Sequence, residues 1–289
     1  MPAPILKRNP FDGKVDIPRL PCHNVNMARF TDPPPFPPHW LEALQALDVR
    51  WQGGDAATQS DIDEALALWR QRLHRPPEPD EEWFDIVDAT GEPLGLMAPR
   101  WFAHLTGLRH RVVHVLCTTP QGLLVLQMRS HRRPDWAQHF STTAAGHVKA
   151  GETWQQAALA EIEEEVGLTR THLSQWLATD ALVPVGAPYL GRKRQERHPT
   201  FLNGLPMLDW QVNQIFTGEI TAWGLTAIHF DDGEVDGVYL TPPKEVARLV
   251  QQRDPSLAPN LFEVFPRWQQ FHAGVFQSRG KLSNDALAE

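Results

Sequence analysis

The sequence predicts an α/β fold, a sheet packed against helices, with a small helical extension before it. Between residues 83 and 130, short apolar runs typical of strands are separated by turn signals at Thr90-Gly91 and Pro120-Gln121-Gly122. Residues 153–166 instead repeat their apolar side chains at the 3.6-residue period of a helix that covers a sheet. Strands followed by a covering helix indicate a layered α/β domain.

The helix at 153–166 has well-marked ends. Thr153 and Gln156 form a capping box, and Gly167 suits the left-handed conformation that stops a helix. The side chains that form its apolar stripe are Leu159, Ile162 and Val166. This stripe should pack on the sheet.

Three glutamates of this helix, Glu161, Glu164 and Glu165, fall together on another face. Glu161 and Glu165 are a like-charge i,i+4 pair near the helix C-terminus, where the macrodipole favours cations. A bound cation would relieve this repulsion, and Mg²⁺, with Mn²⁺ as a second candidate, suits carboxylate ligands. Taken alone, such a run is more typical of a solvated acidic face.

The residues before the helix favour a metal site over a solvated acidic face. Gly146 is followed after five residues by Glu152, and after seven more by Ala160-Glu161-Ile162-Glu163-Glu164-Glu165-Val166-Gly167-Leu168. This spacing resembles the Nudix box of the Nudix hydrolases at every specified position except Ala160, where the family has arginine. The resemblance implies an α/β/α Nudix sandwich with a mixed sheet between helices.

The same resemblance implies roles for single residues. Glu161, Glu164 and Glu165 would hold the metal with the Gly146 carbonyl, and Glu161 and Glu165 would act in catalysis. Nudix hydrolases commonly supply a further glutamate from a later loop, as metal ligand or base. Glu234 is the best match here, and the alternative is an ordinary acidic hairpin turn.

The surrounding chain, from about Trp83 to Val250, is similar to the isopentenyl-diphosphate isomerase-like branch of the Nudix superfamily. In that branch two basic residues before the box hold the diphosphate, and the matching positions are Arg129 and Arg133. Guanidinium groups suit this task because they bind phosphate oxygens in pairs. The alternative is a solvated basic loop that also includes Arg132.

Two departures argue against the isomerase activity itself. The isomerase cysteine stands directly before the box glycine, and that residue here is Ala145. An acidic residue of the isomerases is replaced by Gln211, in the stretch Asp209-Trp210-Gln211. His147 matches the isomerase histidine that contacts its metal, and we expect it at the substrate site; the alternative is a loop residue.

Ala160 bears on whether the site is catalytic. An arginine there would neutralise and orient the carboxylates, so its absence leaves three readings. The metal site is less ordered, Arg170 or another base takes the place of the arginine, or the chain is a non-catalytic module that binds a diphosphate ligand.

Composition favours a cytoplasmic enzyme. The net charge of −8 gives no reason to expect nucleic-acid binding. No apolar run approaches ~18 residues and the amino terminus lacks a charged-then-apolar leader, so neither a membrane span nor secretion is predicted. Cys22 and Cys117 lie far apart in the sequence, which argues against a disulfide or a cysteine zinc site.

We expect three parts: a Pro-rich and helical extension (1–80), a Nudix hydrolase domain (81–250) and a helical extension with a frayed tail from Ser278 (251–289). Within the first part, residues 40–47 and 60–73 have helical periodicity, with Ser60 as the cap. The extension is either a cap over the active site or an appendage for folding or dimerisation. It also resembles, faintly, Nudix proteins related to thiamin pyrophosphokinase.

These observations favour Mg²⁺-dependent hydrolysis of a diphosphate linkage in a nucleoside diphosphate derivative or related small metabolite. The alternatives are the non-catalytic module, isoprenoid diphosphate isomerisation and hydrolysis of thiamine diphosphate analogues. A small-molecule diphosphate is the expected partner, and a homodimer is compatible with the sequence.

Overall fold

A computed structural model describes residues 51–197, 201–202 and 206–285. The Pro-rich segment and the helix predicted at 40–47 lie outside the described residues, as does Cys22. In the described part, no helix is long and apolar enough to cross a membrane. Cys117 is a free, buried residue of the sheet.

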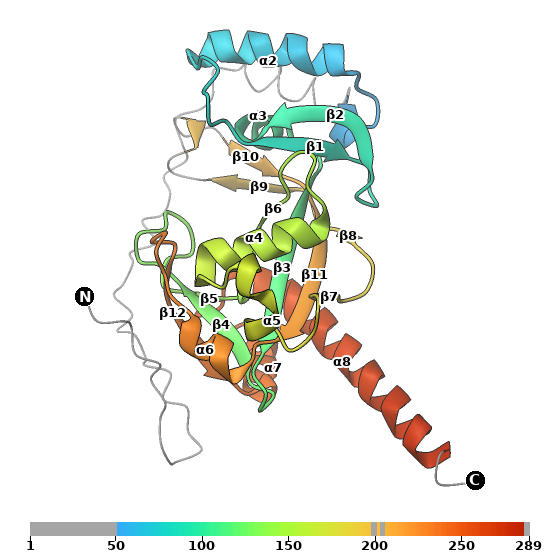
Figure 1. The fold of residues 1–289 in the computed structure, drawn as a ribbon. Helices are drawn as coiled ribbons and strands as arrows, with labels where there is room; N and C mark the ends of the chain where they lie inside the picture. Colours follow the sequence, from blue (N-terminus) through green and yellow to red (C-terminus); the bar gives the residue numbers. More distant parts are fainter. Residues whose placement is uncertain (1–50, 198–200, 203–205, 286–289) are drawn as a thin grey trace.

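The centre of the molecule is a mixed eight-stranded sheet (Figure 1). The strands follow the order β12-β4-β3-β11-β7 across the sheet, and β5, β6 and β8 pair with β4, β3 and β11, respectively. β3 and β11 run parallel, whereas the other pairs are antiparallel. The strands are β3 (His110–Thr118), β4 (Leu124–Arg129), β5 (Phe140–Ser141), β6 (Ala144–His147), β7 (Val183–Pro184), β8 (Tyr189–Leu190), β11 (Gln211–Glu219) and β12 (Val235–Thr241).

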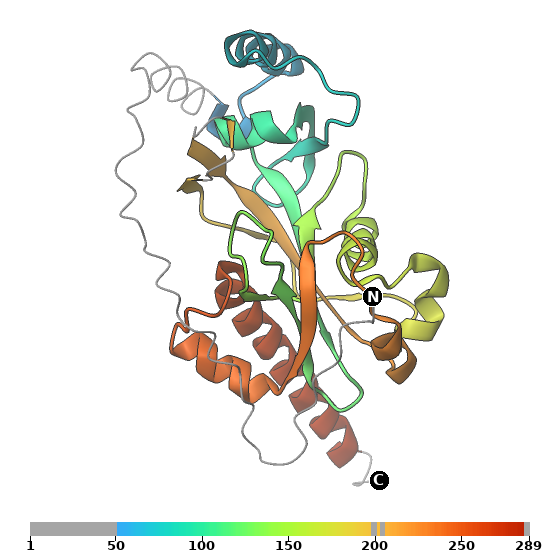
Figure 2. The same cartoon turned by 90° about the vertical axis from the view of Figure 1, so that its left-hand side faces the viewer.

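Helices cover both faces of this sheet, as Figure 2 shows from the side. One face carries α4 (Trp154–Val166), α5 (Leu173–Trp176) and α6 (Ala222–Ala227); the other carries α7 (Pro243–Gln251) and α8 (Pro259–Asp285). Alternate residues of β3 serve the two layers, because successive strand side chains point to opposite faces. Val115 and Cys117 join the α4 core, and Leu116 joins the α8 core. The α/β/α sandwich predicted from the sequence is confirmed.

Helix α4 begins and ends where the sequence predicts. Thr153 and Gln156 form the capping box, and Gly167 closes the helix at φ 74°. Ile162 and Val166 are fully buried, and Leu159 is partly buried against the same core. The helix that carries the glutamates is therefore fixed to the sheet along its apolar stripe.

Residues before β3 form a second packed unit above the sandwich (Figure 1). Its elements are η1 (Gln52–Gly54), α2 (Gln59–Leu73), β1 (Trp83–Val87), β2 (Pro93–Pro99) and α3 (Arg100–Thr106). They enclose a core of their own, which includes Trp51, Trp69 and Phe102. A small hairpin of β9 (Arg194–Arg197) and β10 (Pro206–Asp209) adjoins α3. We call residues 51–106, without this hairpin, the N-terminal module.

Ser60 is not the cap of α2, and that prediction was wrong. The helix begins one residue earlier, at Gln59, because Thr58 and Asp61 form a complete capping box. The Thr58 side chain accepts from the Asp61 N–H, and the Asp61 carboxylate accepts from the Thr58 N–H. A two-sided cap satisfies more of the free amides than a single serine hydroxyl can.

The chain beyond residue 250 packs into the sandwich. Leu261, Val264 and Phe265 of α8 are buried in the core on the second face of the sheet. The helix continues to Asp285, past Ser278, where a frayed end was expected. The three-part division of the chain remains a prediction.

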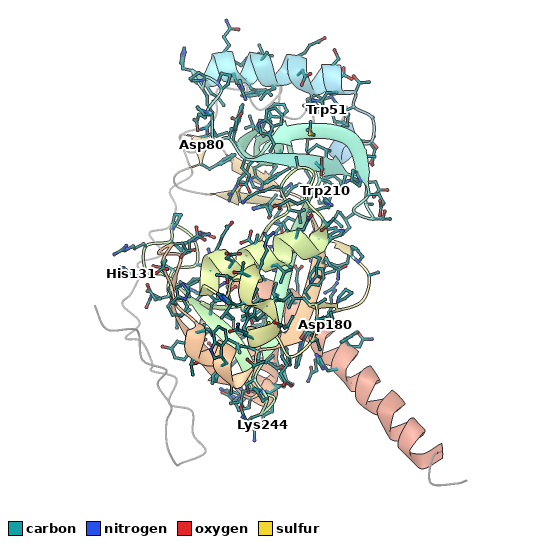
Figure 3. All side chains as sticks on the ribbon, viewed as in Figure 1. Trp51, Asp80, His131, Asp180, Trp210 and Lys244 are labelled. Atoms are coloured by element: carbon teal, nitrogen blue, oxygen red, sulfur yellow. The ribbon has the colours of Figure 1, made fainter. Side chains whose placement is uncertain are left out.

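Side chains fill the junction between the N-terminal module and the sandwich, where Trp210 lies (Figure 3). The Arg109 guanidinium stacks on the Trp210 ring, 5.1 Å from its centroid. Backbone bonds cross the same junction, from Val87 N–H to the Arg109 carbonyl and from Ala150 N–H to the Trp83 carbonyl. These contacts hold the module over one end of the sheet.

Candidate functional site

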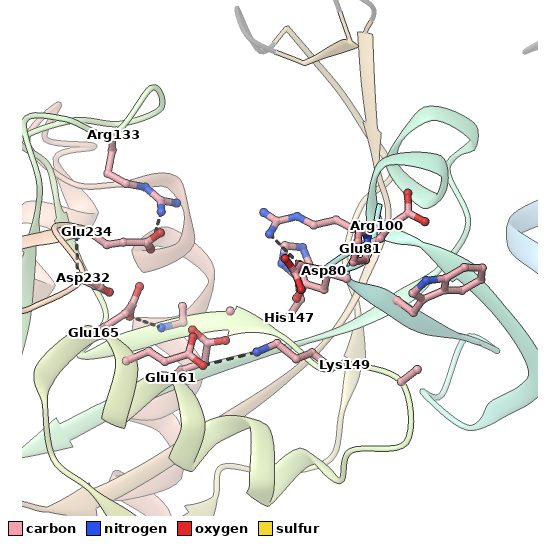
Figure 4. Close-up of a pocket in the computed structure, with 17 residues that line it drawn as sticks. Asp80, Glu81, Arg100, Arg133, His147, Lys149, Glu161, Glu165, Asp232 and Glu234 are labelled. Carbon is pink, nitrogen blue, oxygen red and sulfur yellow. Dashed lines mark hydrogen bonds and ion pairs between the residues drawn. The ribbon is translucent and has the colours of Figure 1, made fainter. Parts of the chain in front are cut away.

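A cleft of about 790 Å³ lies between the end of α4, the loops around β4 and β12, and the start of β1 (Figure 4). Its walls are Pro79, Asp80, Glu81, Glu82, Trp83, Arg100, Arg133, Ala145, Gly146, His147, Lys149, Ala150, Glu161, Glu164, Glu165, Asp232 and Glu234. All three box glutamates predicted from the sequence therefore meet in one cavity.

Glu165 is anchored at the bottom of this cleft and is only 4% exposed. Its carboxylate accepts hydrogen bonds from the Ala145 N–H and the Gln127 amide, both at 2.9 Å. Burial raises the pKa of Glu165 to about 8, and the nearby charge of Glu234 adds to the rise. A solvated acidic face does not describe this residue.

Glu161 lies directly beneath Gly146. A Cβ on Gly146 would fall 2.1 Å from the Glu161 carboxylate, so a side chain at this box position would have to displace that carboxylate. Burial is the main reason that the pKa of Glu161 is raised to about 9, and repulsion from Glu165 and Glu164 adds to the rise. The Gly146 backbone and the Glu161 carboxylate are thus held against each other.

Glu164 is the most exposed of the three, and its carboxylate lies 3.5 Å from the Lys149 ammonium. Lys149 comes from the turn between β6 and α4 and also faces the cleft. The sequence analysis did not identify this lysine, because the box pattern does not specify its position.

The opposite wall carries Glu234 and Arg133 (Figure 4). Their side chains pair with each other, with Arg133 Nη1 2.5 Å from Glu234 Oε2. Glu234 directly precedes β12, and its negative charge raises the pKa of Glu165 across the cleft. The predicted extra glutamate and one predicted arginine are therefore brought to the box carboxylates.

Arg129 is not among the residues that line the cleft, within the described chain. Its guanidinium donates to the Asp135 backbone carbonyl and, at 2.9 Å, to the Asp135 carboxylate. Arg132 is also outside the lining. The structure thus separates Arg133 from the other two arginines of this loop.

The cleft offers the donor set of a hard cation. The Glu161, Glu164 and Glu165 carboxylates of α4 meet the Gly146 backbone of β6 there, and burial raises the proton affinity of Glu161 and Glu165. A divalent cation would displace those protons and neutralise the cluster. The residues present therefore fit the Mg²⁺ or Mn²⁺ expected from the sequence.

A second cluster of possible metal ligands lies beside His147, behind the cleft. The imidazole ligand atoms of His104, His110 and His147 all lie within 4.8 Å of one another. His104 Nε2 and His110 Nε2 are 3.3 Å apart, and Asp209 Oδ1 is 3.8 and 3.7 Å from them. The ring of Phe84 stacks on His110 and His147.

His110 and His147 are held in the neutral form that binds metals. Burial lowers the pKa of His110 to about 4 and that of His147 well below its ordinary value. The buried Nε2 atom of His147 has no hydrogen-bond partner within the described structure. Only His147 was predicted as a site residue, because the ligands come from α3, β3, β6 and β10 and have no common motif.

A model of the NUDIX domain matches residues 108–261, more than half of the 289-residue chain. The chain belongs to the Nudix family. The match begins just before β3 and ends at the start of α8, so it covers the sheet, α4 with its glutamates, and α5 to α7.

Several Nudix proteins are similar to this chain over stretches of about 90 residues. Nudix hydrolase 3 of Arabidopsis thaliana is 41% identical over 90 residues, 30% of this chain and 12% of that protein. The uncharacterized Nudix hydrolase lmo0368 of Listeria monocytogenes is 35% identical over 88 residues, 30% of this chain and 52% of that protein. An isopentenyl-diphosphate Delta-isomerase of Serratia proteamaculans is 29% identical over 89 residues, 31% of this chain and 49% of that protein. The chain spans about half or less of the length of these relatives.

Two solved structures match this chain at lower sequence identity. DR0079 from Deinococcus radiodurans has a TM-score of 0.45 and 19% identity, over 64% of this chain and 98% of that one. The NUDIX domain of NrtR from Shewanella oneidensis, complexed with ADP ribose, has a TM-score of 0.36 and 14% identity, over 55% of this chain and 85% of that one.

Proposed function

We propose that this Nudix protein hydrolyses a diphosphate linkage in a small molecule, a nucleoside diphosphate derivative or related metabolite, with Mg²⁺ or Mn²⁺. The observation that supports this most is the convergence of Glu161, Glu164 and Glu165 with the Gly146 backbone in one cleft. Family membership and the names of the relatives agree with it.

The residues of the cleft have distinct tasks in this proposal. Glu161, Glu164, Glu165 and the Gly146 carbonyl would hold the cation. When bound, the cation supplies positive charge for the phosphate oxygens and lowers the pKa of water. Arg133 would bind a phosphate oxygen pair, for which it must exchange its contact with Glu234.

Glu234 would then be free to accept a proton from the attacking water or to join the cation ligands. Its exposed position on the cleft wall, opposite α4, suits both tasks (Figure 4). In the absence of substrate, the Arg133–Glu234 pair compensates both charges. This exchange of partners is consistent with catalytic groups that align only when substrate is present.

The test is hydrolysis by the purified full chain of a panel of diphosphates, with phosphate detection. The panel includes nucleotide sugars, dinucleotides, oxidised nucleotides, and thiamine and isoprenoid diphosphates. Turnover should require Mg²⁺ or Mn²⁺, and Glu165→Gln should lower kcat by orders of magnitude. Full activity after EDTA treatment would overturn the site. Tight ligand binding without turnover would favour the non-catalytic module.

The isomerase alternative is less supported. Position 145 is an alanine whose N–H donates to Glu165, so no thiol faces the cleft there. Incubation with isopentenyl diphosphate in deuterated water should give no deuterium incorporation. Metal-dependent exchange by the unaltered protein would restore the isomerase reading.

We also propose that the cluster of His104, His110, His147 and Asp209 binds a second cation, of the zinc class. Neutral imidazoles with one carboxylate are ligands of transition metals, not of Mg²⁺. In a tetrahedral site with ~2.0–2.1 Å bonds, the ligand atoms lie roughly 3.4 Å apart. The separations of 3.3, 3.7 and 3.8 Å among His104, His110 and Asp209 are close to that spacing, and the His147 ligand atom lies within 4.8 Å of those of the other two histidines. The resemblance of His147 to a metal-contacting histidine of the isomerases agrees with a cation site at this cluster.

Metal analysis tests the second site. The protein, purified without chelator, should retain about one Zn²⁺-class ion per chain after dialysis. His147→Ala should lose it, and Glu161→Gln should keep it. An ion lost equally from both variants, or from neither, would contradict a separate histidine site.

A further inference from the structure

The carboxylates of α4 lack the positive charge that an arginine at position 160 would supply. Ala160 is a buried methyl group, one turn before Glu164 on the same helix. Glu161 and Glu165 repel each other at i,i+4, and the C-terminal end of the helix disfavours negative charge. A positive charge beside these carboxylates would offset their repulsion once they are ionised.

Three basic residues near α4 are candidates, and the structure distinguishes them. Arg170 lies 3.9 Å from Glu163, which is not among the cleft residues. Arg129 is bonded to Asp135. Lys149 faces the cleft, with its ammonium 3.5 Å from the Glu164 carboxylate (Figure 4).

The backbone fixes Lys149 where it can serve this cluster. Its carbonyl accepts from the Glu152 N–H at 3.1 Å, and its own N–H donates to the Glu152 carboxylate at 3.3 Å. The next residue, Ala150, donates its N–H to the Trp83 carbonyl at 2.8 Å. The turn is thus closed on itself and tied to β1, so the lysine projects from a fixed base.

We propose that Lys149 is the counter-charge of the cation site and takes the place of the absent box arginine. The proposal rests on the cation site of the proposed function, not on any particular substrate. Both side chains of the Lys149–Glu164 pair are about half exposed, so the pair contributes little to folding. Its effect should appear in cation affinity, because a bound divalent ion and the ammonium repel each other.

The sign of this effect separates a counter-charge from a ligand or a structural residue. Loss of a ligand or local unfolding weakens cation binding, whereas loss of a nearby positive charge strengthens it. Lys149→Ala should therefore bind Mn²⁺ about two- to tenfold more tightly. The charge-conserving Lys149→Arg should keep the original affinity.

The experiment is Mn²⁺ titration of the full chain, followed by electron paramagnetic resonance. The relevant ion is the one that Glu161→Gln abolishes, which separates it from any ion at the histidine cluster. Adding Ala160→Arg to Lys149→Ala should return the affinity towards its original value, because the charge is back beside the same carboxylates. Arg170→Ala is the matched control, since it removes an ion pair to α4 outside the cleft and should change nothing.

Each result decides the proposal. Unchanged or weaker Mn²⁺ binding in Lys149→Ala would overturn it, as would an equal gain in Arg170→Ala. Failure of Ala160→Arg to reverse the gain would show that the charge acts elsewhere. If no diphosphate is hydrolysed but the Mn²⁺ affinities behave as described, the hydrolase assignment fails and the role of Lys149 stands.

Discussion

Arg133 is the arginine of the β4–β5 loop that reaches the cleft, and its side chain is about a quarter exposed beside Glu234. A charge-assisted bond to a substrate phosphate contributes roughly 1.5–3 kcal/mol. Arg133→Ala should therefore lower kcat/KM about ten- to a hundredfold. Arg133→Lys should recover part of the loss, because it keeps the charge without the paired donors.

Arg129 and Arg132 are the internal comparisons for this measurement. The sequence analysis gave Arg129 the same role as Arg133, but its guanidinium is engaged by Asp135. Arg129→Ala should act through the loop and through the charge of Arg129 on Glu165, with a smaller loss of kcat/KM than Arg133→Ala, and Arg132→Ala should be tolerated. Equal losses of kcat/KM at all three positions would indicate a diffuse electrostatic field of the basic loop rather than a specific phosphate contact.

The raised pKa values of Glu161 and Glu165 predict how the metal-free protein responds to pH. The folded pKa values, about 9 and about 8, exceed the ordinary value of 4.5, so the folded state binds protons more tightly than the unfolded chain. The stability from this source is fully present below pH 4.5 and is lost as pH rises through the folded pKa values. With EDTA, Tm should fall between pH 6 and pH 9.

Mg²⁺ should oppose this fall, because it replaces the protons on the carboxylates. Glu161→Gln should also flatten the decline in EDTA, since its amide does not ionise. Thermal unfolding followed by circular dichroism at several pH values provides the measurement. A decline that is the same in Glu161→Gln would place the titrating groups elsewhere.

At the scale of elements, local sequence patterns predicted α4 well and α2 less well. The capping box and stop glycine of α4 were both visible, because each lies within four residues of the end it fixes. At α2, two hydroxyl residues, Thr58 and Ser60, precede the apolar run. Asp61, three residues after Thr58, completes the box and selects the earlier start. Periodicity alone could not make that choice.

The contact of β6 with α4 depends on Gly146 having no side chain. Its φ is not in the left-handed region, so an alanine would be tolerated by the backbone and opposed only by the Glu161 carboxylate 2.1 Å away. Gly146→Ala should displace Glu161 and weaken Mn²⁺ binding at least about tenfold, ~1.4 kcal/mol. Gly237→Ala, in β12 where a Cβ meets nothing within 4 Å, is the matched control. Comparable binding in the two variants would contradict the role of this close approach.

At the scale of the whole molecule, the cleft and the histidine cluster depend on how the N-terminal module sits on the sandwich. The box predicted Glu161, Glu164 and Glu165, which lie on one helix. It could not predict Arg100 or the wall formed by residues 79–83, because these reach the cleft through tertiary packing. Likewise His104 and Asp209 are far apart in sequence and meet only when α3 and β10 pack together.

The histidine cluster should connect the N-terminal module to β3 and β6 of the sandwich. His104 belongs to α3 of the module, His110 to the start of β3, and His147 directly follows the box glycine. An ion bound by all three would cross-link these segments, and binding only the folded form would stabilise it. Removal of that ion should therefore loosen the module before it unfolds the sandwich.

Limited proteolysis measures this loosening at residues 74–79, between α2 and β1. Cleavage there should be slow for the protein as purified, faster after a strong chelator with Mg²⁺ present, and slow again after Zn²⁺ is restored. His147→Ala should be cut quickly with or without chelator. His131→Ala, at an exposed histidine outside the cluster, should respond like the unaltered chain. Because Mg²⁺ keeps the carboxylate site filled throughout, a change in cleavage reports the histidine cluster alone. A cleavage rate insensitive to the chelator, in protein shown to contain the ion, would mean that packing around Phe84 and Trp210 holds the module in place without it.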